Sequence, residues 1–374
     1  MHYAGYLIRR ERLSRDWSQE GLCKGICTVA YLSKIEVGKA VPSTEIVTLL
    51  LQRLGLTWQE PVGGAALVEQ GYEALLGNEL DQLTALTARS DWAELDCSPW
   101  ALDAQLLRCF ASDWDSPLDT ALEVCMDMRQ LALQRALQSK DEDALRLYPC
   151  SFLYYLAGDR CYRRGETARA IELLQTAYQL ASQEGRARVM LYARTDMGSC
   201  YSNLRDMTNM QHHYQAAERL ARSLGDSELL SSLRYNIAAT QLELGQYEPA
   251  LAYFETLQTH SPMTLHKLAI CHEKLEHPSA ALAALDQADS LPRQLPEDLE
   301  SQMCTLVRYR LTHPDYLTCE DYGFLLLDCF RRCRSQLPAG YALFHLPWVL
   351  EWYEQHRQYK QAYTLLRDFP EHTG

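Results

Sequence analysis

Two histidines and a glutamate near residue 275 are of the types that bind zinc and activate water in hydrolases. They stand in the run His272-Glu273-Lys274-Leu275-Glu276-His277. A zinc-binding helix needs its two histidines four residues apart, so that both lie on one helical face. Here the separation is five, and the run falls across the end of an expected helix. The sequence therefore favours a solvated or capping role and predicts no metal site.

Cysteine pairs and phosphate-binding loops are two further patterns that could support chemistry. Cys23/Cys27 and Cys329/Cys333 are four apart and could meet on a helix, but neither has the second pair or histidine that zinc requires. The chain has no phosphate-cradling glycine loop and no Gly-x-Ser-x-Gly elbow. We predict reduced, buried thiols, no disulfides, no cofactor and no enzymatic activity.

A third group of residues has the order of a helix-turn-helix. Four short helices are expected in the first 60 residues, at 3–15, 19–24, 29–36 and 44–54. Ser18, Thr28 and Ser43 each precede one of them and are predicted N-caps. Apolar residues at spacings of three and four predict one shared core, formed by Leu22, Ile26, Leu32, Ile35, Ile46, Leu49 and Leu50. The second and third helices then make the motif.

The residues of this segment also resemble those of a known family. Ser18-Gln19-Glu20 and Ser33-Lys34-Ile35-Glu36-Val37-Gly38-Lys39 resemble the Cro/repressor-type (XRE) helix-turn-helix. The short turn at Gly25-Ile26-Cys27 is similar to the Rgg/PlcR (RRNPP-type) branch of peptide-sensing regulators. The resemblance covers roughly residues 5–57. It implies a cytoplasmic, homodimeric transcription regulator that binds an inverted-repeat operator in double-stranded DNA and takes part in quorum sensing.

The geometry of such a motif assigns roles to side chains. A recognition helix lies in the major groove with its N-terminal residues at the base edges, while flanking amides and cations hold phosphates. Base contacts are expected from Thr28, Val29 and Tyr31. Phosphate contacts are expected from Gln19, Lys34 and Lys39.

Charge is distributed unevenly along the chain. Residues 1–60 carry eight Lys/Arg and six Asp/Glu, a net +2, whereas the whole chain has a net charge of −13. The basic segment 1–60, called the head below, can contact DNA phosphates. The acidic remainder of the chain repels DNA and so discourages non-specific wrapping. Charges near the N-terminus and the lack of a long apolar run predict a protein that is neither exported nor membrane-bound.

A 40-residue period runs from about residue 150 to 260. Gly165, Arg205 and Gly245 are equivalent in this register, and Leu244-Gly245-Gln246-Tyr247 is typical of a tetratricopeptide repeat. Further units fit less well at 265–288 and 346–366. The sequence thus predicts an all-α fold with a right-handed TPR-like superhelix, divided into 1–57 (helix-turn-helix), 58–145 (linker helix and degenerate pairs) and 146–374 (ligand sensing and dimerisation).

In such arrays the first helix of each pair lines the concave wall, so the register nominates ligand contacts. Asparagines suit a peptide because each amide can both donate to and accept from a backbone. The predicted peptide-binding residues are Tyr162, Arg163, Asp196, Ser199, Asn203, Tyr235, Asn236 and Lys267. The alternatives are that these residues only pack the repeats, that the ligand is a non-peptide such as a lipid, or that the chain is a protein-interaction adaptor with an auxiliary helix-turn-helix.

Overall fold

The regular elements of this chain are helices. The computed structural model describes residues 3–112, 117–257, 260–292, 295 and 299–367. No β-strand occurs in those ranges, and helical repeats follow an N-terminal helix-turn-helix, which confirms the predicted fold class. The chain divides into two compact units, one of Met1–Leu156 with Thr176–Val189 and one of Ala157–Gln175 with Met190–Gly374. No described helix has the length and apolar character needed to cross a membrane.

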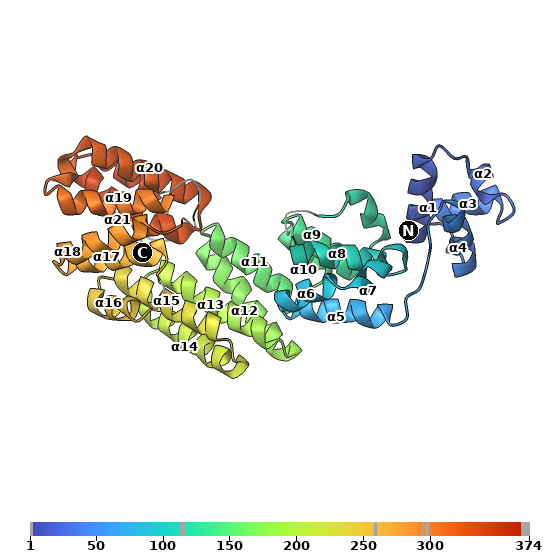
Figure 1. Cartoon of the computed structure of the whole chain (residues 1–374), viewed down its shortest axis with the longest axis horizontal. Helices are drawn as coiled ribbons and strands as arrows, with labels where there is room; N and C mark the ends of the chain where they lie inside the picture. Colours follow the sequence, from blue (N-terminus) through green and yellow to red (C-terminus); the bar gives the residue numbers. More distant parts are fainter. Residues whose placement is uncertain (1–2, 113–116, 258–259, 293–294, 296–298, 368–374) are drawn as a thin grey trace. The chain divides into compact units, whose positions relative to one another are not determined.

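The first unit begins with four short helices and continues with further helices (Figure 1). Its α-helices are α1 (Tyr3–Ser14), α2 (Gln19–Cys23), α3 (Val29–Glu36), α4 (Thr44–Arg53), α5 (Gly64–Leu76), α6 (Leu80–Thr87), α7 (Ser90–Ala93), α8 (Ala101–Ser112), α9 (Met128–Leu137) and α10 (Asp141–Leu147). Two short 3-10 helices are η1 (Glu94–Cys97) and η2 (Thr120–Cys125).

Capping side chains set where the N-terminal helices begin. Ser18, Thr28 and Ser43 each accept a hydrogen bond from the backbone N–H three residues later, at 3.0, 3.2 and 3.4 Å. These bonds satisfy N–H groups that have no partner within the first turn. Gly25 (φ 77°) and Gly38 (φ 72°) follow α2 and α3 in the left-handed region. All three predicted caps are confirmed.

The N-terminal core contains most of the apolar residues expected there. Leu22, Leu32, Ile35 and Leu50 are fully buried, and Ile26 and Ile46 are partly buried. Leu49 is 42% exposed, so its predicted place in the core is wrong. The reason is that α4 turns a neighbouring face inward, the one that carries Val47, Leu50 and Leu51.

This core extends beyond the predicted boundary at residue 57. Trp58 is 6% exposed and belongs to the same cluster, together with Ala101, Leu102 and Leu122. The amide of Gln105 on α8 donates to the Tyr3 hydroxyl at 3.3 Å. The helix-turn-helix therefore shares its apolar core with α8 and η2.

The helices after α10 form successive pairs (Figure 1). They are α11 (Ser151–Arg163), α12 (Thr167–Glu184), α13 (Ala187–Asn203), α14 (Met207–Leu224), α15 (Ser227–Glu243), α16 (Tyr247–Glu255), α17 (Pro262–Lys274), α18 (Pro278–Asp289), α19 (Leu299–Thr312), η4 (Tyr316–Thr318), α20 (Glu320–Gln336), α21 (Ala339–Gln355) and α22 (Tyr359–Arg367). The unit boundary passes through α11 and α12, so the break predicted at residue 145 does not coincide with it.

The turn between the helices of a pair contains a residue with positive φ in the described repeats, except between α19 and α20, which are joined by a longer connection with η4. Gly165, Arg205 and Gly245 have φ values of 78°, 57° and 77°, so the 40-residue register is visible in the backbone. Glu276 and Arg357 occupy the same place between α17 and α18 and between α21 and α22, with φ values of 62° and 53°. The turn is therefore retained where the sequence repeat is weak.

Small residues allow the paired helices to approach each other. A Cβ placed on Gly198 would lie 2.5 Å from the Tyr214 ring, and one on Gly158 would lie 2.8 Å from Leu174. These two glycines are 40 residues apart, in the first helices of successive pairs. The equivalent residue of the next pair is the buried Ala238.

Candidate functional site

The exposed face of α3 is the first candidate site. Leu32 and Ile35 are buried beneath the helix, whereas Thr28, Val29 and Lys34 are exposed. Val29 leaves 43% of its surface open although it is apolar. This face offers a methyl-bearing surface at the start of a short helix and a cation in its last turn, a combination that suits base edges and flanking phosphates.

Thr28 has a second role that the sequence had also indicated. Its hydroxyl oxygen accepts the Tyr31 backbone N–H at 3.2 Å, so the side chain caps α3. Tyr31 is half-buried and packs against the N-terminal core. Both residues are therefore structural elements of the helix as well as candidate base contacts.

A buried ion pair fixes α3 against α1. Arg12 donates from Nε and Nη2 to the two carboxylate oxygens of Glu36, at 2.7 and 2.9 Å. The Arg12 Nη1 atom donates to the Trp17 carbonyl oxygen at 2.7 Å. The bond to Glu36 raises the pKa of Arg12 above its ordinary value. The loop after α1 and the recognition helix are thus held by one guanidinium group.

Gln19 is drawn into the same network. Its Nε2 atom donates to Glu36 Oε2 at 2.8 Å, which leaves one amide N–H for a phosphate. Lys34 and Lys39 are exposed and form no ion pair with any residue in the described ranges. The predicted phosphate contacts therefore comprise one side chain with a structural bond and two that point to solvent.

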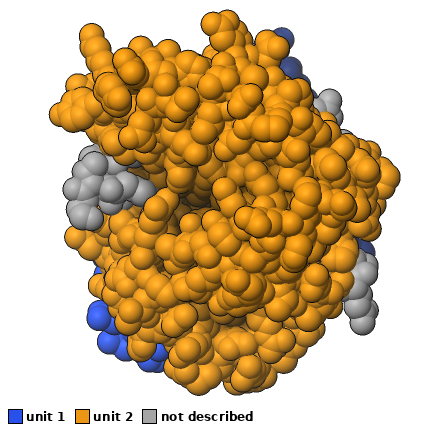
Figure 2. Space-filling view, turned by 90° about the vertical axis from the view of Figure 1, so that its left-hand side faces the viewer, with its two compact units in different colours: residues 1–156, 176–189 blue, residues 157–175, 190–374 orange. Residues whose placement is uncertain are grey.

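The second candidate site is a pocket in the repeat unit, of about 410 Å³. Figure 2 shows a face of this unit that is hollowed near its centre. The walls of the pocket come mainly from the first helices of the pairs, α11, α13, α15, α17 and α21. A second cavity of about 250 Å³ shares Ser202, Asn203, Glu243 and Phe344 with it. The two cavities therefore adjoin at these four residues.

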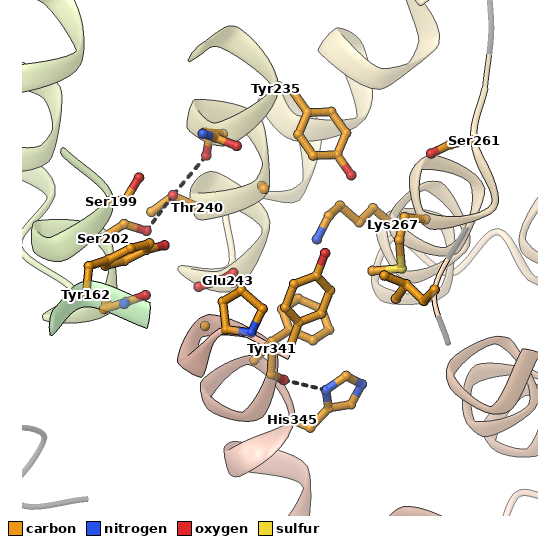
Figure 3. A pocket seen from close by; sticks show the side chains of 18 of the residues that line it. Tyr162, Ser199, Ser202, Tyr235, Thr240, Glu243, Ser261, Lys267, Tyr341 and His345 are labelled. Atoms are coloured by element: carbon orange, nitrogen blue, oxygen red, sulfur yellow. Dashed lines mark hydrogen bonds between the residues drawn. The ribbon is translucent and has the colours of Figure 1, made fainter. Parts of the chain in front are cut away.

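Hydrogen bonds between neighbouring helices order the polar wall of the pocket (Figure 3). Ser202 Oγ and Thr240 Oγ1 lie 2.7 Å apart, and Thr240 Oγ1 donates to the Asn236 carbonyl oxygen at 2.9 Å. Ser199 Oγ and the Tyr214 hydroxyl lie 3.0 Å apart. The buried Nδ2 atom of Asn203 has no hydrogen-bond partner among the described residues. The wall therefore retains an unused amide donor.

Charged side chains lie in the same pocket: Lys267 is buried, whereas Glu243 is exposed. Partial desolvation of its carboxylate raises the pKa of Glu243, while the nearby Lys267 lowers it. Burial lowers the pKa of Lys267, and Glu243 opposes that shift. His345 donates from Nδ1 to the Tyr341 carbonyl oxygen at 2.8 Å. The pocket thus presents basic and acidic groups to a ligand.

Six of the eight predicted peptide contacts line this pocket. They are Tyr162, Ser199, Asn203, Tyr235, Asn236 and Lys267. Arg163 is exposed and pairs with Asp159 at 2.8 Å, and Asp196 is partly buried, with a pKa raised chiefly by burial. These two side chains are not part of the pocket wall.

Sequence reasoning missed several residues of the wall. Ser202, Ala239 and Thr240 come from the repeat helices, and Ser202 stands 40 residues after Tyr162. Extending the register to every position of the first helices would have found them. Tyr341, Phe344 and His345 come from α21, outside the clear repeats.

Family models assign both regions. Residues 8–60 match the model described as helix-turn-helix, and residues 186–258 match the model described as tetratricopeptide repeat. The chain combines a helix-turn-helix with tetratricopeptide repeats. The helix-turn-helix match takes in the recognition helix α3. The tetratricopeptide match covers α13 to α16, which supply Ser199, Asn203, Tyr235 and Asn236 to the pocket.

Comparisons of the whole chain with curated sequences and solved structures say less about the two modules than the family models do. No curated protein sequence matches this helix-turn-helix and tetratricopeptide chain. Among solved structures it is similar to PlcR of Bacillus thuringiensis in complex with the peptide PapR7 and DNA, with 15% sequence identity, 76% of this chain and 99% of that chain covered, and a TM-score of 0.33. The assignment of the two modules rests on the family models.

Proposed function

We propose that this chain is a sequence-specific DNA-binding transcription regulator of the Rgg/PlcR kind, controlled by a short signalling peptide. The DNA-binding part of the proposal is supported by the exposed face of α3, within a segment that matches a helix-turn-helix model. Val29 and Lys34 are open to solvent there, while the other face of the helix is locked into a core. Such a helix is free to enter a major groove.

The repeat pocket supports the peptide part of the proposal. Hydroxyl, amide and charged groups alternate with apolar side chains along two adjoining cavities. Asn203 and Asn236 can each donate to and accept from an extended backbone. A ligand that spans both cavities would contact Asn203 from either side, because this residue lines both.

Control of transcription follows if the peptide and DNA each bind two arrangements of the chain with different affinities, whether they favour the same arrangement or opposite ones. A homodimer in the cytoplasm would place two recognition helices on the half-sites of an inverted repeat, one helical turn apart. A peptide that binds one arrangement of the dimer more tightly than another shifts the population towards it. In this proposal the helix-turn-helix contacts DNA, and the repeat pocket makes DNA binding respond to the peptide.

Selection of bound fragments from random DNA tests the proposal. The purified chain is compared with a Val29→Ala/Tyr31→Ala/Lys34→Ala variant and with a Lys360→Ala control on the exposed surface of α22. Thr28 is left intact because it caps α3. We expect wild type and control to enrich an inverted repeat and the triple variant to enrich none. Failure of the wild-type protein to enrich any sequence, with and without added peptides, would favour the adaptor instead.

A further inference from the structure

One lysine inside the pocket has no direct polar partner. Lys267 on α17 lines the larger cavity and is 9% exposed. Its Nζ atom lies 4.9 Å from the centroid of the Phe344 ring, and within the described ranges it forms neither a hydrogen bond nor an ion pair. A buried ammonium group without such partners is unfavourable, and a ligand that supplies them gains binding free energy.

Two tyrosine hydroxyls lie beside this ammonium group. Figure 3 shows the Lys267 side chain pointing into the space between the hydroxyls of Tyr235 and Tyr341. Burial raises the pKa of Tyr235 to about 12 and raises that of Tyr341 as well. Both hydroxyls therefore keep their protons at neutral pH and can donate. Three donors border one region of the cavity.

Acidic residues limit the charge of the anion that fits. Glu243 and Glu300 line the same cavity, and they repel a doubly charged phosphate more strongly than a singly charged carboxylate. Met263, Leu295 and Phe344 add apolar surface nearby. The site thus favours a carboxylate attached to an apolar neighbour.

We propose that Lys267, together with Tyr235 and Tyr341, binds a carboxylate group of the ligand. The proposal rests on the function proposed above in so far as that ligand is a peptide. The carboxylate is that of the peptide's C-terminus or of an Asp or Glu side chain. Charge-assisted hydrogen bonds from the ammonium and hydroxyl groups would compensate for the water that both partners lose.

The test uses two synthetic pools of random-sequence pentapeptides, one with free carboxyl termini and one with amidated termini. Each pool is incubated with the full chain, and bound peptides are identified and their affinities measured. If peptides bind only when their C-terminus is free, the carboxylate that the site recognises is the terminal one. If the amidated peptides that bind all contain Asp or Glu, the site recognises a side-chain carboxylate. If amidated peptides that lack Asp and Glu bind as tightly as peptides with a carboxylate, this proposal is overturned. The proposal that the chain binds a peptide would still stand.

A substitution provides the second arm. Lys267→Met keeps the length of the side chain and removes its charge. We expect it to lower the affinity for the selected peptides by about thirtyfold or more. Lys360→Met, on the exposed face of α22, should leave their affinity unchanged. The acid-against-amide comparison on the wild-type chain decides the question even if Lys267→Met fails to fold. Absence of binding by both pools would contradict peptide sensing itself, and this proposal with it.

Discussion

Arg12 and Glu36 form a two-pronged ion pair that ties α1 to the recognition helix, with donor–acceptor distances of 2.7 and 2.9 Å. Only 10% of the Arg12 side chain and 2% of the Glu36 side chain are exposed. Gln19 adds a third bond to the same carboxylate. The orientation of α3 therefore depends on one carboxylate group beneath its exposed face.

Glu36→Gln should destabilise the head strongly. The substitution leaves the Arg12 guanidinium buried without a counter-charge, a change that costs about 3 to 5 kcal/mol in comparable pairs. Amide hydrogen exchange across α1 and α3 measures the effect, and we expect faster exchange in both helices. The matched control is Arg10→Gln, which breaks the exposed pair with Glu11 and should change stability by about 0 to 1 kcal/mol. Equal effects of the two substitutions would contradict this role for the buried pair.

The sequence was most informative where local chemistry decides structure. N-caps depend on one side chain and the next backbone amides, so Ser18, Thr28 and Ser43 could be assigned without tertiary information. The Arg12–Glu36 pair joins positions that are 24 residues apart, and no local pattern indicates that they meet. Leu49 was misplaced because spacing alone does not say which side of α4 faces the core.

Arg205→Gly should stabilise the repeat unit. Arg205 adopts φ 57° at the turn where the repeats before and after it have glycine. A left-handed backbone costs a residue with a Cβ about 1 kcal/mol, and glycine avoids this cost. We expect a higher melting temperature by circular dichroism. Gly245→Ala, the reverse change at the equivalent turn, should lower it, and a lower melting temperature for Arg205→Gly would contradict the explanation.

Lys34→Ala should weaken DNA binding in a way that depends on salt. The loss of one phosphate contact lowers the slope of log affinity against log salt by about one, and affects all sequences alike. Fluorescence anisotropy with a selected fragment at several salt concentrations measures the slope. Lys360→Ala serves as the control. An unchanged slope in Lys34→Ala would remove this lysine from the set of phosphate contacts.

His213 should make the repeat unit less stable in acid. Burial, with the charge of Arg194, lowers the pKa of His213 from 6.5 to about 4. Between these pH values the unfolded chain binds more protons at this site, so its contribution is complete above pH 6.5 and is lost as the pH falls towards about 4. Urea unfolding across this range should show a shallower pH dependence in His213→Gln, and the exposed His313→Gln is the control. Identical pH dependence in all three proteins would contradict the assignment.

The pocket could be anticipated only in part from the sequence. The 40-residue register identified the helices that carry Asn203 and Asn236, because repeat geometry assigns the first helix of each pair to one wall. Tyr341 and Phe344 belong to α21, where the repeat signal is weak, and they enter the pocket through the tertiary fold. The register also nominated Arg163 and Asp196, which lie on the helices that line the pocket but are not among the residues of its wall.

We expect the repeat pocket to control DNA binding by the helix-turn-helix, and reciprocal binding measurements test this coupling most directly. The affinity of the full chain for a selected DNA fragment is measured with and without saturating peptide, and the peptide affinity with and without DNA. Asn203→Ala is the matched variant, because the Nδ2 atom of Asn203 has no hydrogen-bond partner among the described residues. We predict that wild-type DNA affinity changes by a factor of about 5 to 150, that peptide affinity changes by the same factor, and that Asn203→Ala binds DNA normally but loses the response. Unchanged DNA affinity at saturating peptide would contradict the claim.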